Sequence, residues 1–303
     1  MKIFLTLLLF LFSAPLFANT VIPYHYHGDG KFQLRSNHTT QHFEGKFRNE
    51  DGSYNEAALK KINLVFQANY NNPETRISIR LLEFIDFLQD HFHGGTITLS
   101  SGYRNPVYNQ NLRNNGKLAA KASLHQYGMA ADLKIQGVSS KKIWEYMREI
   151  SFGGAGYYGG EYIHVDTGPA RFWDQNTSKV GTDISDDNKL LILVPEKDFY
   201  LSEKNITVKV VRVTSWPLFL SSHFTLINKD GTKKKKKEIK LVLGEKKAEE
   251  CLEFHTVKSV SNLLFELPKK VKAGSYSLIA RVCKRDNVDT PSEIETTLLR
   301  IAP

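Results

Sequence analysis

The sequence predicts an α+β domain in residues 19–175, with a small antiparallel sheet and helices, followed by an all-β, immunoglobulin-like sandwich in residues 189–303. Three observations support this division. Helix and strand patterns alternate in the first half of the chain, whereas only short strand patterns occur in the last third. Between them, residues 176–188 are polar and rich in Asp, Ser and Thr, which is typical of a linker.

The first 18 residues have the pattern of an export signal. Lys2 supplies a positive charge, residues 3–12 form an apolar run, and small residues lead to Ala18, where we expect cleavage. The apolar run is too short for a membrane helix, and no later stretch approaches the roughly 20 apolar residues that a span requires. We therefore expect a periplasmic or secreted protein without a transmembrane segment.

Helix and strand signals follow one another in the first domain. Residues 55–69 have a helical pattern, and a stronger one opens at Pro73, repeats apolar residues to Leu88 and closes at Gly94. The remaining elements are expected in this order: a strand at 96–100, a short helix from 105, a strand at 130–135, a helix at 139–147 and a strand at 162–167.

Short strand signals separated by turn residues fill the second domain. Seven strands in about 115 residues are typical of a sandwich of two antiparallel sheets. They are expected at 190–194, 206–213, 224–228, 239–243, 263–267, 276–283 and 296–301.

Charge and cysteine placement distinguish the two domains. The formal net charge is +9, and residues 186–303 carry 22 Lys and Arg against 16 Asp and Glu. The basic run at 233–237 predicts either a solvated loop or attraction to an anionic cell-envelope surface, and nothing predicts a nucleic-acid partner. Cys251 and Cys283 either form one disulfide or remain two buried thiols.

The polar residues of two predicted strands carry the candidate chemistry. If the strands alternate regularly, Asp132 shares a face with Lys134, and His164 shares a face with Asp166, while apolar residues take the opposite faces. Residues 19–185 contain no cysteine, so a metal there needs His and carboxylate ligands. Spacing alone leaves open that these histidines are ordinary core or surface residues.

Three segments together resemble a known family. Residues 101–104 have the sequence Ser-Gly-Tyr-Arg, residues 123–132 fit Ser-x-His-x-x-Gly-x-Ala-x-Asp, and residues 164–173 fit His-Val-Asp-Thr-Gly-Pro-x-Arg-x-Trp. In this order they are similar to the D-alanyl-D-alanine metallopeptidase superfamily, and more closely to its murein endopeptidase K branch. The resemblance covers about residues 24–175. It implies a compact α+β zinc peptidase domain with a metal site in a groove.

The resemblance also implies residue roles. His125, Asp132 and His164 correspond to zinc ligands, and Arg104 corresponds to a residue that binds a substrate carboxylate or the developing oxyanion. Ser123 corresponds to a residue that hydrogen-bonds the substrate. A surface ion pair remains an alternative for Arg104, and a turn hydroxyl remains one for Ser123.

The general base and the groove wall are less well defined by the motifs. Glu161 stands three residues before His164, where many superfamily members have a catalytic Glu, although strict alternation puts it on the opposite face. Asp166 shares the face of His164 and could instead orient its imidazole. Tyr103 either borders the groove or packs against the domain.

The implied activity is hydrolysis of peptide bonds in peptidoglycan, by attack of a zinc-bound water on stem peptides or their cross-links. Two alternatives stay open. One is a carboxypeptidase that removes terminal D-alanine with the same metal site. The other is a non-catalytic cell-wall-binding protein that retains the ligands and lacks a working base.

Overall fold

The computed structural model describes residues 21–231, 235–242 and 250–302. The export signal expected at residues 1–18 lies outside the described residues. Within them, no helix is both long enough and apolar enough to cross a membrane.

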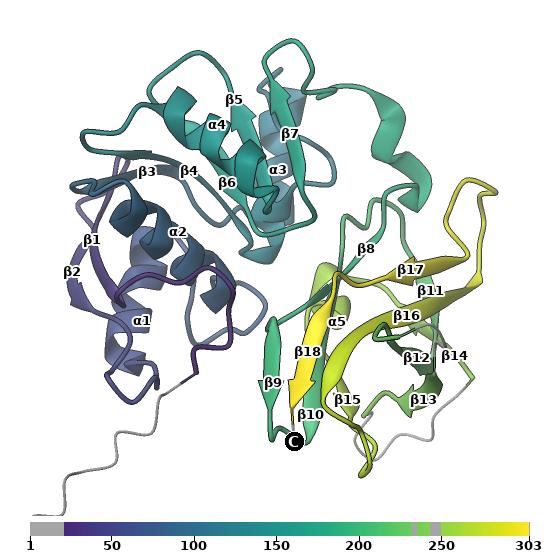
Figure 1. The fold of residues 1–303 in the computed structure, drawn as a ribbon. Helices are drawn as coiled ribbons and strands as arrows, with labels where there is room; N and C mark the ends of the chain where they lie inside the picture. The colour runs from purple at the N-terminus through teal and green to yellow at the C-terminus, as the bar shows by residue number, and fades with distance from the viewer. Residues whose placement is uncertain (1–20, 232–234, 243–249, 303) are drawn as a thin grey trace, which may run out of the picture.

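A seven-stranded sheet forms the centre of residues 21–174, which we call the N-terminal part (Figure 1). The strand order is β2-β1-β3-β4-β6-β5-β7. The strands are β1 (Lys31–Ser36), β2 (His42–Lys46), β3 (Ile97–Ser101), β4 (Ala130–Ile135), β5 (Gly154–Tyr157), β6 (Ile163–Asp166) and β7 (Arg171–Asp174). The strands expected at 96–100, 130–135 and 162–167 are confirmed as β3, β4 and β6.

The sheet is mixed, and the expectation of a small antiparallel sheet was wrong. β1 pairs with β3 and β5 pairs with β7 in parallel, whereas the other neighbouring strands are antiparallel. The chain leaves β2 through two helices and returns as β3 on the far side of β1. Such a long crossover allows parallel pairing, which a short hairpin turn cannot provide.

Four helices accompany this sheet: α1 (Glu56–Val65), α2 (Ile79–His91), α3 (Pro106–Asn114) and α4 (Ser140–Ile150). The helix expected to open at Pro73 begins only at Ile79. Asn72 explains the difference, because its carbonyl accepts two backbone N–H groups and its side chain accepts the N–H of Glu74. These turn hydrogen bonds compete with a helical start at the proline.

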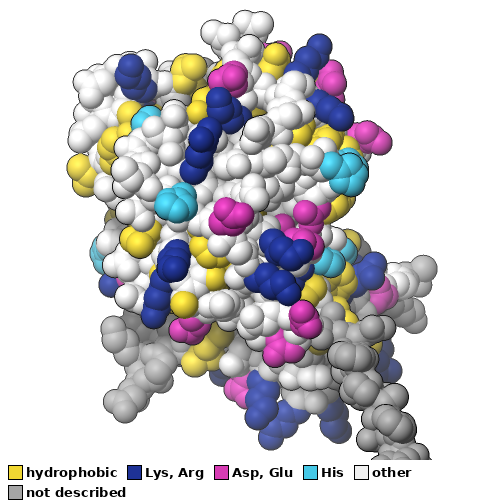
Figure 2. All heavy atoms as spheres, turned by 90° about the vertical axis from the view of Figure 1, so that its left-hand side faces the viewer, with side chains coloured by type: hydrophobic (Ala, Val, Ile, Leu, Met, Phe, Trp, Pro, Cys, Tyr) yellow, Lys and Arg dark blue, Asp and Glu magenta, His cyan; other side chains and the backbone are white. Residues whose placement is uncertain are grey.

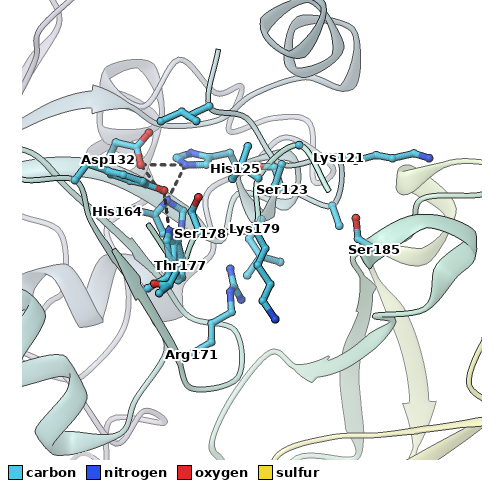
Figure 3. Close-up of a pocket in the computed structure, with 18 of the residues that line it drawn as sticks. Lys121, Ser123, His125, Asp132, His164, Arg171, Thr177, Ser178, Lys179 and Ser185 are labelled. Atoms are coloured by element: carbon cyan, nitrogen blue, oxygen red, sulfur yellow. Dashed lines mark hydrogen bonds and ion pairs between the residues drawn. The ribbon is translucent and has the colours of Figure 1, made fainter. Parts of the chain in front are cut away.

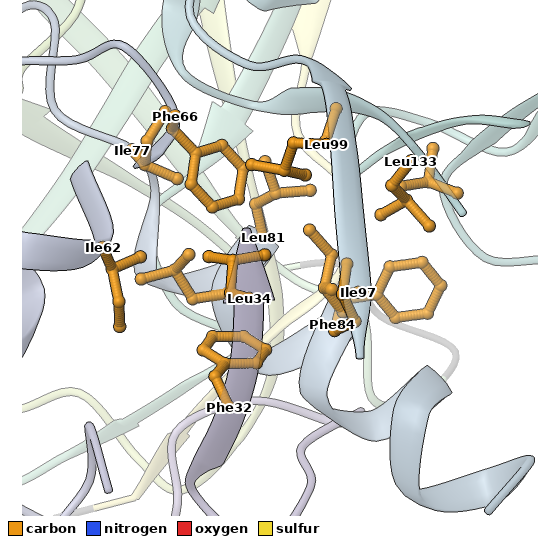
Figure 4. Packing of buried hydrophobic residues seen from close by; sticks show 14 of the residues in the cluster. Phe32, Leu34, Ile62, Phe66, Ile77, Leu81, Phe84, Ile97, Leu99 and Leu133 are labelled. Carbon is orange, nitrogen blue, oxygen red and sulfur yellow. The ribbon is translucent and has the colours of Figure 1, made fainter. Parts of the chain in front are cut away.

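The core of the N-terminal part lies on one face of the sheet. Ile62 of α1, Leu81 of α2 and Ile143 of α4 join Leu133 and Ile163 of the sheet in one fully buried cluster, part of which Figure 4 shows. Each such side chain contributes roughly 1.5–3 kcal/mol through burial. Because the helices cover this face, the polar residues of β4 and β6 are turned to the other one.

In residues 189–302, which we call the C-terminal part, the described segments form two β-sheets around a shared core. Phe224, Phe265 and Leu278 are almost fully buried there. One sheet has the order β15-β10-β8, and the other has eight strands. The strands are β8 (Ile192–Pro195), β9 (Phe199–Leu201), β10 (Asn205–Val211), β11 (Leu218–Ser221), β12 (His223–Asn228), β13 (Lys236–Lys240), β14 (Cys251–Phe254), β15 (Leu263–Glu266), β16 (Gly274–Lys284), β17 (Glu293–Glu295) and β18 (Leu299–Ala302).

Each of the seven strands expected in this part overlaps an observed strand. A short helix, α5 (Val257–Val260), precedes β15. Cys251 of β14 and Cys283 of β16 form a disulfide with Cα atoms 6.0 Å apart, so the bridge that the sequence allowed is present.

The two parts contact each other along several segments. Arg80 of α2 forms a buried ion pair with Asp198, at 2.8 Å. Residues 183–188 form two short 3-10 turns, together labelled η2 (Asp183–Asn188), with a kink at Asp186 and Asp187. The side chain of Asn188 accepts the backbone N–H groups of Thr214 and Ser215 at 2.8 and 2.9 Å. The segment expected as a linker is thus hydrogen-bonded to the C-terminal part.

Candidate metal centre

Three adjacent elements bring the expected metal ligands together. Asp132 on β4 lies directly opposite His164 on β6 in the antiparallel register. His125 lies on a short 3-10 helix, η1 (Leu124–Tyr127), which ends at Gly128 in the left-handed conformation and leads into β4. Residues far apart in sequence therefore meet because of strand register and one tight turn.

The three side chains converge on a single point (Figure 3). The Nδ1 atom of His164 is 3.0 Å from Oδ1 of Asp132, and Nε2 of His125 is 3.4 Å from the same oxygen. The two imidazole nitrogens are 3.2 Å apart. One ligand atom from each residue lies within 4.8 Å of the others, so the group could hold a metal ion.

The outer nitrogen of each imidazole has its own oxygen partner. His125 Nδ1 is 2.7 Å from the carbonyl oxygen of Gly102, and His164 Nε2 is 3.0 Å from Oδ2 of Asp166. In the neutral rings these outer nitrogens carry the protons, because a carbonyl and a carboxylate accept hydrogen bonds. The inner nitrogens then face each other and Asp132 as three acceptors, an arrangement that fits a cation between them.

Burial and charge act differently on the two histidines. Burial lowers the pKa of His125, whose side chain is 1% exposed. Burial acts in the same direction on His164, but the hydrogen bonds that the doubly protonated ring donates to Asp132 and Asp166 outweigh it and raise its pKa. Burial thus favours the neutral form of the His125 ring, which is the form that binds a metal.

Asp166 is a fully buried carboxylate that forms the back of the site. It accepts the N–H groups of Gly154 and Gly168 at 3.1 and 2.9 Å and a guanidinium N–H of Arg171 at 2.7 Å. Burial opposes its ionisation, but Arg171 and His164 outweigh this and lower its pKa to about 2. A Cβ at residue 154 would lie 2.1 Å from the carboxylate, which explains the glycine there.

Arg104 and Ser123 lie on the rim of the site. Arg104 donates to Oδ2 of Asp132 at 2.5 Å and to Oγ of Ser101 at 2.8 Å. Ser123 is the residue before η1, its hydroxyl caps no helix N–H, and it lines the same cavity. The structure thus brings both residues beside the three candidate ligands.

Tyr103 and Glu161 occupy different positions from these. Tyr103 packs against the hydrophobic core and is not among the residues that line the cavity. Glu161 lies at the cavity edge, is exposed, and forms an ion pair with Lys134 at 2.8 Å. Because β6 begins at Ile163, strand alternation does not determine the direction of Glu161.

A cavity of ≈ 670 Å³ opens from the three candidate ligands toward the C-terminal part. Trp173 of β7 forms one wall, with its ring 5.1 Å from that of His164 and its Nε1 donating to the Tyr158 hydroxyl at 2.7 Å. The motif from residue 164 to 173 contained Trp173 without indicating this contact. Arg212 of the C-terminal part also lines the cavity, and no motif in the sequence pointed to it.

Comparison with known proteins agrees with the expected resemblance. The family model described as peptidoglycan L,D-endopeptidase MepK matches residues 27–173. The peptidoglycan L,D-endopeptidase MepK of Escherichia coli K12 is 33% identical over 144 residues, which cover 46% of this chain and 78% of that protein.

The probable peptidoglycan L,D-endopeptidase MepK of Haemophilus influenzae is 30% identical over 143 residues, covering 46% of this chain and 76% of that relative. The family match ends before the C-terminal part. The protein is therefore an enzyme with a metallopeptidase domain of the M15 type. The chain belongs to the MepK-like branch of the D-alanyl-D-alanine metallopeptidase superfamily.

Proposed function

We propose that this protein is a zinc-dependent peptidoglycan hydrolase that cleaves peptide bonds in murein stem peptides or their cross-links. The observation that carries the proposal is the convergence of three acceptor atoms from His125, Asp132 and His164, with both outer imidazole nitrogens already paired to oxygen. Two histidines and one carboxylate are a known ligand set of catalytic zinc, which leaves a position for substrate or water. The relatives named above act on peptidoglycan, as their names state.

In this proposal the inner nitrogens of His125 and His164 and a carboxylate oxygen of Asp132 would hold zinc. When bound, zinc supplies a Lewis acid and makes a nucleophilic water available near neutral pH. Asp166 orients His164 by accepting its outer N–H, so that the inner nitrogen keeps its lone pair for the metal. Arg171 and the two glycine N–H groups hold Asp166 ionised in this role.

The remaining residues act on the substrate. Arg104 lines the cavity beside the candidate ligand Asp132. From this position its guanidinium stabilises negative charge that develops on the substrate next to the metal site. Ser123 donates a hydrogen bond to the substrate backbone. Glu161 takes the proton from the attacking water once the Lys134 ion pair opens, which its exposed position allows. Tyr103 supports the Arg104 segment from the core side rather than touching substrate.

We propose further that the protein consists of a zinc peptidase domain, residues 19–175, and an immunoglobulin-like sandwich, residues 189–303, joined by residues 176–188. Export through the segment 1–18 would place it in the periplasm or outside the cell, where peptidoglycan lies. The basic excess of the C-terminal domain suits contact with an anionic envelope surface. On the face of the molecule in Figure 2, by contrast, acidic and basic side chains are interspersed.

Digestion of purified sacculi tests the proposed activity. The full chain is expected to release soluble muropeptides, a chelator to stop the release, and added zinc to restore it. Split cross-linked dimers identify an endopeptidase, and loss of single alanines identifies a carboxypeptidase. His164→Ala should abolish release, whereas His42→Ala, at an exposed position of β2, should not. Binding to sacculi without any release would mean a non-catalytic wall-binding protein and would contradict the proposal.

A further inference from the structure

Arg212 belongs to the C-terminal part but lines the same cavity as the candidate metal ligands. It follows β10, and its neighbours on both sides are fixed to the N-terminal part. Val211 is buried in a small cluster with Leu124 and Tyr127 of η1. The backbone N–H of Val213 donates to the Tyr127 hydroxyl at 3.1 Å. The element that carries His125 therefore also positions Arg212.

The backbone of Arg212 is in an unfavourable conformation. Its φ is 63°, in the left-handed region that residues with a Cβ seldom occupy. Such a conformation persists only when the surrounding contacts determine it, and it is commonly found at ligand-binding positions. Here the contacts of Val211 and Val213 hold the peptide on either side, and the result is that Arg212 extends into the cavity.

The guanidinium groups of Arg212 and Arg171 have unused donors. In the described part of the chain, Nε of Arg212 and Nη1 of Arg171 are buried and have no hydrogen-bond partner. Burial, together with the positive charge of Arg171, lowers the pKa of Arg212 to about 10. Asp166 is a nearby counter-charge, but it already accepts from Arg171 and contacts His164. Arg171 is paired with Asp166, so the two guanidinium groups together carry one positive charge more than this carboxylate balances, and each keeps an N–H group without a partner.

The charged residues that line the rest of the cavity are also mostly positive. Its lining contains six basic residues and two acidic ones, Asp132 and Glu161. The basic residues are Arg104, Arg113, Lys121, Arg171, Lys179 and Arg212. Figure 3 shows Arg171 and Lys179 on the side of the cavity away from Asp132. Asp166 and Asp186 lie outside the lining and pair with Arg171 and Lys121, and the positive charge that remains attracts an anionic ligand next to the candidate metal site.

We propose that Arg212 and Arg171 form a carboxylate-binding subsite of the cleft, so that the C-terminal part completes the substrate site of the peptidase. The ligand is a free carboxylate of the murein stem peptide, since guanidinium groups match carboxylates with paired hydrogen bonds. This inference rests on the proposed peptidoglycan hydrolase function. It gives the C-terminal part a direct role in specificity, separate from any contact with the envelope surface.

A comparison of two matched substrates tests the subsite. One is a cross-linked stem-peptide dimer with free carboxylates, and the other is the same dimer with those carboxylates converted to primary amides. The wild-type chain should prefer the free form in kcat/KM. Arg212→Gln should lower kcat/KM for the free form about 10- to 100-fold and change that for the amide little, because one charge-assisted interaction is lost.

Arg281→Gln is the matched control, since Arg281 is an exposed residue of β16 outside the cavity lining. It removes the same charge from the same part of the chain and should keep the wild-type preference. Equal losses of Arg212→Gln on both substrates, or an unchanged preference, would overturn the subsite. If the wild-type chain hydrolyses neither dimer, the proposed function fails. In that case, the affinities of both dimers for the wild-type chain and for Arg212→Gln, measured by calorimetry, test the subsite independently of hydrolysis.

Discussion

The hydrogen bond between Tyr127 and Val213 connects η1 with the C-terminal part, and its removal should affect both stability and specificity. Tyr127 is 2% exposed, and its hydroxyl accepts the backbone N–H of Val213, which is 7% exposed. In Tyr127→Phe the ring still fills its site, but the buried N–H loses its acceptor. An unsatisfied buried donor costs about 1–3 kcal/mol, so the free energy of unfolding should fall by that amount.

The same change should loosen the placement of Arg212, because one of its two flanking contacts is lost. We expect the preference of Tyr127→Phe for free over amidated stem peptide to fall several-fold, with zinc affinity unaltered. Denaturant unfolding monitored by circular dichroism gives the stability, and kcat/KM on the two substrates gives the preference.

Tyr200→Phe provides the control for a general effect of destabilisation. Tyr200 is equally buried, and its hydroxyl bonds to the carbonyl oxygen of Thr207 at 3.1 Å within the C-terminal part. It should lose similar stability and keep the substrate preference. If Tyr200→Phe loses the preference to the same degree, the effect comes from stability alone, and the proposed link between η1 and Arg212 is refuted.

Three further predictions concern the base, a buried carboxylate and the disulfide. Glu161→Gln should retain bound zinc by metal analysis and lose at least 10-fold in kcat, and full activity would exclude Glu161 as the base. Burial raises the pKa of Asp86 to about 8, so folded Asp86 keeps a proton that the unfolded chain releases above about pH 4. The free energy of unfolding should therefore fall as pH rises from about 4 to 8, and Asp86→Asn, assayed with chelator present, should remove this slope. Replacing Cys251 and Cys283 together by Ser should lower the free energy of unfolding by about 3–4 kcal/mol, because the bridge closes a loop of 32 residues. An unchanged denaturation midpoint would contradict this.

The strands that carry the site were predictable because their pattern is local. Strand alternation predicted that Asp132 and Leu133 point to opposite faces of their strand, and likewise His164 and Ile163. The structure buries both apolar residues in the core. The family motifs, in their order along the chain, then identified Asp132 and His164, the same residues that the sheet register brings together.

Other features depend on contacts that no local pattern records. The strands β5 and β7 are short, and β5 is half glycine, so that alternation is weak. Their parallel pairing depends on the path of the chain between them. Arg212 follows a strand with ordinary alternation, and its position in the cavity arises from contacts with η1 more than 80 residues away, such as that of Val213 with Tyr127. Its positive φ cannot be read from the residue type, because arginine carries no preference for it.

The hydrophobic core also determines the geometry of the candidate metal centre. In the β4–β6 pair, Asp132 faces His164 in the same register that places Leu133 beside Ile163 in the core. A shift of β6 by one residue against β4 would turn His164 into the core and Ile163 toward the cavity. Burial of the apolar pair stabilises the observed register by several kcal/mol, far more than an exposed ion pair could. The core therefore sets the candidate ligands at their short separations, and under the proposed function zinc affinity should depend on core residues that do not touch the ion.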